Sequence, residues 1–318
     1  MSHSPRILIV GAAGQLGLAL QGSFKGRGEV VAAGRESADL ADPDQICDLV
    51  RRVRPAVILN AAAYTAVDRA ESEPERAMAI NALAPRILAD EALRSDALLV
   101  HYSTDYVFDG QKSGPWTEED APAPLNVYGA SKLAGEQAIR ESGARHLIFR
   151  TSWVYGPHGQ NFLFTMLRLA RQRDTLSIVD DQFGSPTTSI ELAQATRTIV
   201  SGVLAGQFGT PQQWAGLYHM TCSQSTTWCG LAQAIFARAG KLLDGKAPLV
   251  TPIATADYPT PAKRPRNSVL SNARLQDSFG VSLAPWQTAL DAVFQALIPG
   301  AGTTSPASVP TQNTVPLQ

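Results

Sequence analysis

The sequence predicts an α/β fold, in which a doubly wound parallel sheet is joined to a smaller C-terminal domain. Short apolar runs such as 6–10 and 55–60 alternate with helical patterns in the first half of the chain, as in a buried parallel sheet. A glycine-rich turn follows the first run, and the alternation loosens after about residue 180. With 318 residues, 44% of them hydrophobic, the chain has room for one large domain or two joined ones.

The first predicted strand, 6–10, leads into the pattern Gly11-x-x-Gly14-x-x-Gly17, after which leucines recur at helical spacing. Glycines permit a tight turn and let backbone N–H groups approach a pyrophosphate at a helix N-terminus, where the helix dipole favours anions. A glycine turn between a first strand and a helix therefore predicts a nucleotide cofactor and a sheet of the Rossmann type.

The second predicted strand, 29–33, is followed by Gly34 and Arg35. NAD sites usually place an acidic residue here to hold the ribose 2′-hydroxyl, whereas a nearby arginine accommodates a 2′-phosphate. The sequence thus favours NADPH, with NADH still possible and an exposed loop arginine as the alternative interpretation of Arg35.

The next elements place a hydroxyl at the ligand-binding edge of the sheet. A capped helix over 42–53, a strand over 55–60, small residues at 61–63, a helix over 73–93 kinked at Pro85 and a strand over 97–102 follow in order. Thr104 stands just after that strand, where doubly wound sheets bind ligands. We predict that it hydrogen-bonds the reacting carbonyl; the alternative is a threonine that only holds a turn.

Asn126 is the predicted N-cap of a helix that carries Tyr128 and Lys132. Residues four apart share a helix face, and a cation near a phenol lowers its pKa. Tyr128 is therefore predicted to give a proton to a carbonyl oxygen that is being reduced, or to take one from an alcohol that is being oxidised. The alternative is an amphipathic helix with a half-buried tyrosine and a solvated lysine.

The second half predicts a domain that is mainly substrate-binding. Strands are expected at 146–150, 176–179 and 217–220, and helices at 161–173, 190–204, 227–239 and 285–297. We assign 1–156 to a dinucleotide-binding domain, to which elements near 174–200 and 216–240 return, and 157–298 mainly to substrate binding. The uncharged, aperiodic stretch 299–318 is expected to be a disordered tail.

Charge and cysteine content narrow the function classes. The net charge is −1, from 27 basic and 28 acidic residues, so no electrostatic attraction to nucleic acid or to an anionic membrane is expected. The chain shows no signal-peptide pattern and no apolar run of membrane-spanning length, which predicts a cytoplasmic protein. The three cysteines, at 47, 222 and 229, are too few and too far apart for a disulfide framework or a zinc site.

Taken together, the glycine turn, Ser103-Thr104-Asp105 and Tyr128-x-x-x-Lys132 resemble the extended short-chain dehydrogenase/reductase family. Further segments, at 60–68, 70–74, 101–108, 124–129, 150–155 and 258–262, are similar to the dTDP-4-dehydrorhamnose reductases, over about residues 6–297. The resemblance implies NAD(P)H-dependent reduction of the C4 ketone of dTDP-4-dehydro-L-rhamnose. In that reaction Tyr128 protonates the new alkoxide, Lys132 holds the nicotinamide ribose, and Thr104 hydrogen-bonds the sugar oxygen.

The same resemblance assigns further residues. Ala19 stands where some relatives place a glutamate that bridges a dimer through a metal, so we expect no metal, although Glu191 remains, and a monomer or weak homodimer. From charge alone, we infer that Arg264 or Arg266 meets the substrate diphosphate; the alternative is a surface arginine. The expected cofactor-binding residues are Gly11, Gly14, Gln15, Leu16, Gly17, Arg35, Asp39, Leu40, Ala62, Ala63, Thr65, Tyr102, Tyr128 and Lys132, and the expected substrate-binding residues are Thr104, Asp105, Tyr106, Tyr128, Trp153, Arg264 and Arg266.

Two other functions stay open at this point. One is another nucleotide 4-ketosugar reductase, an epimerase or a 4,6-dehydratase; Tyr106 argues against a dehydratase, which would want an acidic pair beside Thr104. The other is a non-catalytic regulatory subunit of the kind that binds methionine adenosyltransferase, against which the intact Thr104, Tyr128 and Lys132 argue.

Overall fold

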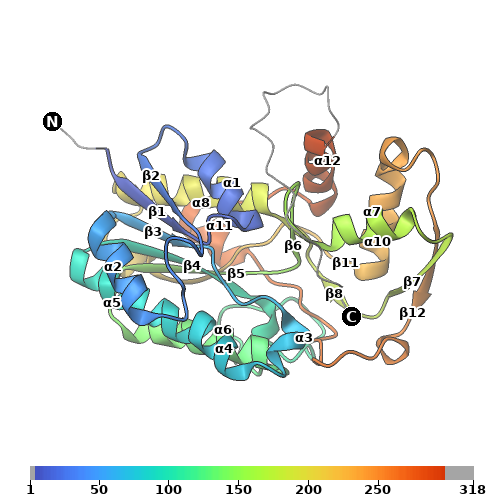
Figure 1. Cartoon of the computed structure of the whole chain (residues 1–318), viewed down its shortest axis with the longest axis horizontal. Helices are drawn as coiled ribbons and strands as arrows, with labels where there is room; N and C mark the ends of the chain where they lie inside the picture. Colours follow the sequence, from blue (N-terminus) through green and yellow to red (C-terminus); the bar gives the residue numbers. More distant parts are fainter. Residues whose placement is uncertain (1–3, 298–318) are drawn as a thin grey trace.

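A six-stranded sheet forms the centre of the molecule in the computed structural model, which describes residues 4–297 (Figure 1). The predicted tail, 299–318, lies outside the described residues. Every strand pair in the large sheet is parallel, which confirms the predicted α/β fold. In spatial order the strands are β10 (Gly216–His219), β5 (His146–Thr151), β4 (Leu98–Thr104), β3 (Val57–Asn60), β1 (Arg6–Val10) and β2 (Glu29–Ala33).

The sheet is buried on both faces because its central strands carry apolar side chains at successive positions. In β1, Ile7 and Ile9 contribute to one core, and Leu8 and Val10 contribute to the other, as the two-residue period of a strand requires. The bounds of β1 and β2 are those that the apolar runs predict.

Helices cover both faces of the large sheet (Figure 1). The core on one face includes residues of α1, α8 and α11, and the core on the other includes residues of α2, α5 and α6. Their bounds are α1 (Gln15–Phe24), α8 (Ser189–Leu204) and α11 (Ala273–Phe279) on the first face, and α2 (Pro43–Val53), α5 (Ala84–Ser95) and α6 (Val127–Glu141) on the second.

The strand order contains a switch point between β1 and β3. The chain moves from β1 to one side to form β2, and the next strand, β3, pairs with the opposite side of β1. In open α/β sheets the crevice at such a point, beyond the carboxyl ends of the strands, binds the ligand. The turn after β1, at Gly11, and the small residues after β3, at 61–63, both lie at this point.

The helix predicted over 73–93 is divided into α4 (Pro74–Met78), a π turn (Ala79–Leu83) and α5. Pro85 has no N–H to offer the carbonyl of Asn81, so the regular ladder is interrupted there. The side-chain carboxamide of Asn81, within the π turn, bonds the backbone of Tyr64 and donates to the hydroxyl of Ser131. The predicted kink therefore takes the form of a π turn that ties three segments together.

The expected strand at 176–179 does not join the large sheet. It forms β7 (Thr175–Val179), which pairs with β12 (Leu249–Ile253) in a separate two-stranded sheet, near α7 (Phe162–Ala170) and α10 (Trp228–Arg238). Only alternate side chains of β7, Leu176 and Ile178, are buried, so this strand suits a sheet with one covered face. β10 does return to the large sheet beside β5, and α8 packs on α1. The division into two domains stays a prediction.

The remaining elements, most of them short, complete the chain. They include two more strand pairs, β6 with β9 and β8 with β11. The bounds are β6 (Val154–Tyr155), β8 (Phe183–Gly184), β9 (Thr187–Thr188), β11 (Thr226–Thr227), α3 (Val67–Ala70), α9 (Pro211–Trp214), α12 (Trp286–Leu297) and the 3-10 turns Asp105–Val107, Gly240–Leu242 and Thr255–Asp257.

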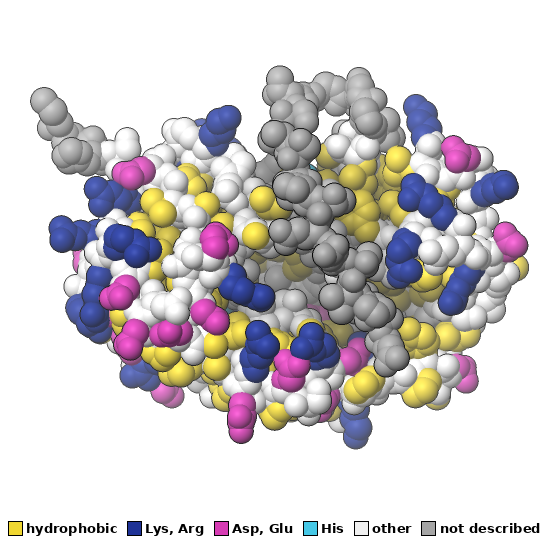
Figure 2. Space-filling view, in the orientation of Figure 1, with side chains coloured by type: hydrophobic (Ala, Val, Ile, Leu, Met, Phe, Trp, Pro, Cys, Tyr) yellow, Lys and Arg dark blue, Asp and Glu magenta, His cyan; other side chains and the backbone are white. Residues whose placement is uncertain are grey.

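The face of the molecule in Figure 2 carries basic and acidic side chains interspersed with apolar ones. Within residues 4–297, no helix combines the length and the apolar character needed to cross a membrane.

Candidate active site

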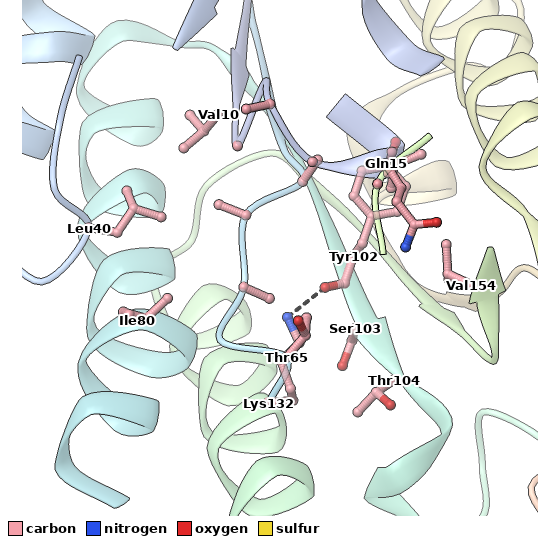
Figure 3. A pocket seen from close by; sticks show the side chains of 18 of the residues that line it. Val10, Gln15, Leu40, Thr65, Ile80, Tyr102, Ser103, Thr104, Lys132 and Val154 are labelled. Atoms are coloured by element: carbon pink, nitrogen blue, oxygen red, sulfur yellow. Dashed lines mark hydrogen bonds between the residues drawn. The ribbon is translucent and has the colours of Figure 1, made fainter. Parts of the chain in front are cut away.

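A cavity of about 730 Å³ opens at the switch point, between the ends of β1, β3 and β4 and the segment that follows β5 (Figure 3). Its volume lies within the range of typical ligand sites. The cavity brings together sixteen of the residues expected from the sequence to bind cofactor or substrate: Gly11, Gly14, Gln15, Leu16, Arg35, Asp39, Leu40, Ala62, Ala63, Thr65, Tyr102, Thr104, Asp105, Tyr128, Lys132 and Trp153.

The glycine turn is a backbone surface on which side chains have no room. Gly11 has a φ of +79°, and a Cβ there would lie 2.7 Å from the backbone of Ala62. Gly17 does not line the cavity; a Cβ on it would lie 2.2 Å from the carbonyl oxygen of Gly11. Gly17 therefore lets the helix pack under the turn, while Gly11 and Gly14 face the ligand space.

The N-terminus of α1 is open to an anion. Gly14 is its N-cap and offers no side-chain hydrogen bond to the first turn, so the leading N–H groups keep their capacity to donate. The side chain of Gln15 is engaged elsewhere, because its carboxamide oxygen accepts from Asn161 at 2.8 Å and its nitrogen donates to the carbonyl of Gln160. The cradle of backbone and helix end fits a dinucleotide pyrophosphate.

At the end of β2, the residues fit a phosphate better than a ribose hydroxyl. The Glu36 carboxylate turns back and accepts a hydrogen bond from the Gly34 N–H at 3.2 Å, while Arg35 is exposed and lines the cavity. An arginine on the cavity wall, with the carboxylate of the next residue already paired to backbone, agrees with a 2′-phosphate ligand.

Thr104 ends β4 and fills one of the two roles considered for it, that of holding a turn; its hydrogen bond to a reacting carbonyl stays a prediction. Its hydroxyl accepts from the Tyr106 N–H at 3.2 Å, so it does hold the turn, and it donates to the Asp105 carboxylate at 3.0 Å. The ring of Tyr106 does not line the cavity but packs edge-on against Tyr128, with centroids 5.8 Å apart. Thr104, Asp105 and Tyr128 thereby meet at one end of the cavity.

The expectation that Lys132 lowers the pKa of Tyr128 is wrong for the chain by itself. Burial raises the pKa of Tyr128 to about 12; the Thr104 hydroxyl acts in the opposite direction and the Asp105 charge adds to the increase. Burial outweighs any electrostatic help because the Lys132 ammonium is directed elsewhere. At neutral pH the Tyr128 phenol is therefore protonated.

Lys132 is buried and points along the end of β4. Its Nζ donates to the carbonyl oxygen of Tyr102 at 2.7 Å (Figure 3) and lies 3.2 Å from Nε2 of His101, whose other ring nitrogen contacts Asn60. Burial lowers the pKa of Lys132 to about 8, although the Glu136 carboxylate acts against this shift. Burial and the neighbouring Lys132 also lower the pKa of His101, which keeps its ring neutral.

A buried ion pair lies between α6 and the strands β4 and β5. Arg150 donates to both carboxylate oxygens of Glu136, at 2.9 and 2.6 Å, and the Ser103 hydroxyl also donates to Glu136. These bonds anchor α6 to β4 and β5. Glu136 also lies one helical turn after Lys132, where its negative charge raises the pKa of the lysine.

Asp105 is the other titratable group at this end. Burial raises the pKa of its carboxyl to about 7, and its Oδ2 has no hydrogen-bond partner within the described part of the chain. The Ser268 and Thr104 hydroxyls act against this increase in the pKa.

The two arginines expected at the substrate diphosphate are separated. Arg264 pairs with Asp68 at 2.9 Å and lines neither cavity, whereas Arg266 lines a second cavity of about 500 Å³ together with Lys112 and Phe183.

Sequence reasoning missed several contributors. Arg76, Ile80 and Gln160 also line the main cavity. His101 contacts Lys132 directly, and Asn60 contacts His101 on the other side of its ring. His101 carried a usable signal, since it lies in β4 three residues before Thr104. Arg76 and Gln160 carried none, because only the fold brings their segments to the cavity. Among residues 4–297 no cluster of three or more His, Cys, Asp or Glu could hold a metal, and the Glu191 carboxylate accepts from the Ala284 N–H.

Comparison with known proteins gives one family. Residues 5–298 match the model of the RmlD substrate binding domain. The chain is 46% identical to a dTDP-4-dehydrorhamnose reductase of Burkholderia thailandensis, over 90% of this chain and 96% of that protein. It is 44% identical to one of Escherichia coli, over 92% and 97%. A crystal structure of the Bacillus anthracis dTDP-4-dehydrorhamnose reductase in complex with NADP superposes with a TM-score of 0.83 at 34% identity, over 92% and 99%.

Proposed function

We propose, from the premise that this chain belongs to the dTDP-4-dehydrorhamnose reductase family, that it reduces the C4 ketone of dTDP-4-dehydro-β-L-rhamnose to dTDP-L-rhamnose with NADPH. The family model spans nearly the whole chain, and the relatives at 44–46% identity carry that name over nearly their whole length.

One observation of the structure supports the proposal most directly. Thr104, Tyr128 and Lys132 come from two different elements and line the same cavity as the glycine turn. A proton donor and a hydride source act on the two ends of one C=O bond, so a carbonyl reductase must place its acid in the cofactor cavity. This arrangement provides that placement.

The cofactor fits the residues present. NADPH supplies the hydride; the glycine turn and the N-terminus of α1 hold its pyrophosphate, and Arg35 meets its 2′-phosphate. Lys132, fixed by the Tyr102 carbonyl, holds the nicotinamide ribose. Asp39, Leu40, Ala62, Ala63 and Thr65 bind along the length of the cofactor.

Tyr128 supplies the proton. A phenol with a pKa of about 12 is protonated at neutral pH, which is the form a reduction requires. Thr104 donates its hydroxyl hydrogen to the sugar oxygen in exchange for its bond to Asp105, and the Asp105 Oδ1 that this exchange frees accepts from a sugar hydroxyl.

For the diphosphate, Arg266 is the better of the two expected arginines. Arg264 is already neutralised by Asp68, while Arg266 makes no ion pair within residues 4–297. Against the alternative of an epimerase, solved UDP-glucose 4-epimerases share the fold at 20% identity or less, which carries no function. Against a purely regulatory subunit, the cavity keeps its acid, its hydroxyl and its lysine. The cytoplasmic location and the monomer or weak homodimer stay predictions.

Tyr128→Phe tests the proposal. The purified protein is coupled to enzymatically made dTDP-4-dehydrorhamnose, and NADPH oxidation is followed by absorbance. We expect a loss in kcat of about 10²–10⁴-fold, because only the transferable proton is removed, with NADPH affinity nearly unchanged. Near-normal turnover by the variant would refute the role of Tyr128. Wild-type turnover of another nucleotide ketosugar only would refute the substrate.

A further inference from the structure

Trp153 has a backbone conformation that large side chains seldom adopt. It stands between β5 and β6 on the cavity wall with a φ of +46°. A bulky residue in the left-handed region is strained and persists only where its surroundings hold it, which happens often at functional sites. The structure therefore has to contain the groups that hold this indole.

Trp228 covers one face of the indole. The two rings are stacked with centroids 3.6 Å apart and planes inclined by only 8°. Trp228 is itself fixed, since its Nε1 donates to the Gln182 carboxamide at 3.2 Å and the Gln182 nitrogen donates to Thr255 at 3.1 Å. The stack is thus anchored in the part of the chain that carries β12 and α10.

Gly184 covers the opposite face. A Cβ on it would lie 2.4 Å from Cε2 of Trp153 and 2.7 Å from both Cζ2 and Nε1, two of the three atoms bonded to Cε2. A point that is closer to Cε2 than to Cζ2 and Nε1 lies above the ring, because an approach from the rim between these two atoms would bring it nearer to them than to Cε2. Since Trp228 occupies the other face at stacking distance, Gly184 has to lie on this one.

We propose that Trp228 and Gly184 form a clamp that positions Trp153 for the nucleotide-linked ketosugar. With both faces covered, only the edge of the indole remains to meet a ligand, and its Nε1 makes no hydrogen bond within the described residues. The clamp fixes the direction of that edge. This inference rests on the proposed function and adds Trp228 and Gly184 to it as positioning residues that do not touch the reacting atoms.

Three variants and one control test the clamp. Gly184→Ala pushes the indole from one side, Trp228→Ala removes its support on the other, and Trp228→Phe keeps an aromatic face. Gly22→Ala is the control, because a Cβ on Gly22 in α1 meets nothing within 4 Å. Each protein is measured for its far-ultraviolet exciton couplet, which reports the stacked indoles, for its affinities for NADPH and dTDP-L-rhamnose, and for kcat and KM.

We expect Trp228→Ala to lose the couplet. Both Gly184→Ala and Trp228→Ala should raise KM and the Kd for dTDP-L-rhamnose about tenfold, because a small misplacement of a contact group has effects of this order. NADPH affinity should stay within twofold, and kcat should fall less than KM rises. Trp228→Phe should restore KM to within about threefold of wild type. Gly22→Ala should match wild type throughout.

Two results would overturn the clamp: a disrupted couplet with unchanged KM and dTDP-L-rhamnose affinity, or an equal loss of NADPH affinity in the clamp variants. If Gly184→Ala does not fold, the pair of Trp228 variants decides. Failure of the proposed function is separate, because it shows as absent turnover in the wild type. In that case the Kd for dTDP-L-rhamnose, compared between the clamp variants and wild type, still tests the clamp. A wild type that does not bind this nucleotide sugar would overturn both the proposed function and the clamp.

Discussion

Gly17→Ala is expected to disrupt the cofactor site from beneath. The added Cβ would lie 2.2 Å from the Gly11 carbonyl oxygen, which is 1.2 Å closer than the 3.4 Å at which ordinary contact begins, and 2.8 Å from Cα of Ala12. These are backbone atoms of a turn that also packs against Ala62, so the clash can be relieved only if the turn moves. Overpacking of this kind costs about 1–3 kcal/mol.

The same displacement moves the N–H groups that receive the pyrophosphate. We therefore expect a Tm several degrees lower than wild type and a loss of NADPH affinity of at least about tenfold, in line with the effect of small displacements on positioned ligands. Thermal unfolding and NADPH fluorescence titration measure the two effects. Gly22→Ala, in the same helix, should instead stabilise by about 0.5–1 kcal/mol, because alanine is the better helix former and has free space there. A Gly17→Ala protein with wild-type Tm and NADPH affinity would refute the reasoning.

Three further predictions follow from buried or exposed charge. Lys132→Met should lose activity, yet it should raise the free energy of unfolding at pH 7 by roughly 1–3 kcal/mol, and with it the Tm. Between pH 8 and 10.5 the lysine binds more protons in the unfolded state than in the folded state, so the gain in stability should shrink across that window. A gain that does not depend on pH in thermal unfolding would contradict this prediction. Glu136→Gln should lower the free energy of unfolding by about 3–5 kcal/mol, because it leaves Arg150 buried without its counter-ion. The double variant Glu136→Gln with Arg150→Met should recover much of this stability in urea unfolding. If the double variant instead loses the sum of the two single losses, the two residues are not a coupled pair. Arg35→Ala should weaken NADPH about tenfold and leave NADH affinity unchanged in titrations, and equal losses for both cofactors would remove Arg35 from the 2′-phosphate site.

The large sheet was predictable because its central strands are buried on both faces and the apolar runs of its strands are short and bounded. β1, β2 and the helix that begins at the Asp42 cap were all located from local pattern, and the structure gives them nearly those bounds. The strand β7 was located too, but its partner was not. Its alternating exposed residues, Thr175 and Ser177, indicate a sheet with one covered face, and no local pattern names β12 as the neighbour.

At the site, the types of the residues were predictable from the sequence, but the directions in which their side chains point were not. The spacing of Tyr128 and Lys132 places both on one helix face, but burial decides where the ammonium points, and it points to the Tyr102 carbonyl. For the same reason the sign of the Tyr128 pKa shift could not be read from its neighbour in sequence. Arg264 illustrates a third limit, because its pairing with Asp68 joins positions nearly two hundred residues apart.

The position of β10 constrains how the chain can be shortened. β10 is the outer neighbour of β5, and it comes from a part of the chain that follows β7, so the sheet is finished only after most of the protein has been made. A fragment that stopped at residue 156 would leave β5 without its outer partner and would expose a row of unpaired backbone N–H and C=O groups that can pair with another molecule. Such a fragment should aggregate on expression, even though it would contain the glycine turn, Thr104 and the Tyr128 helix.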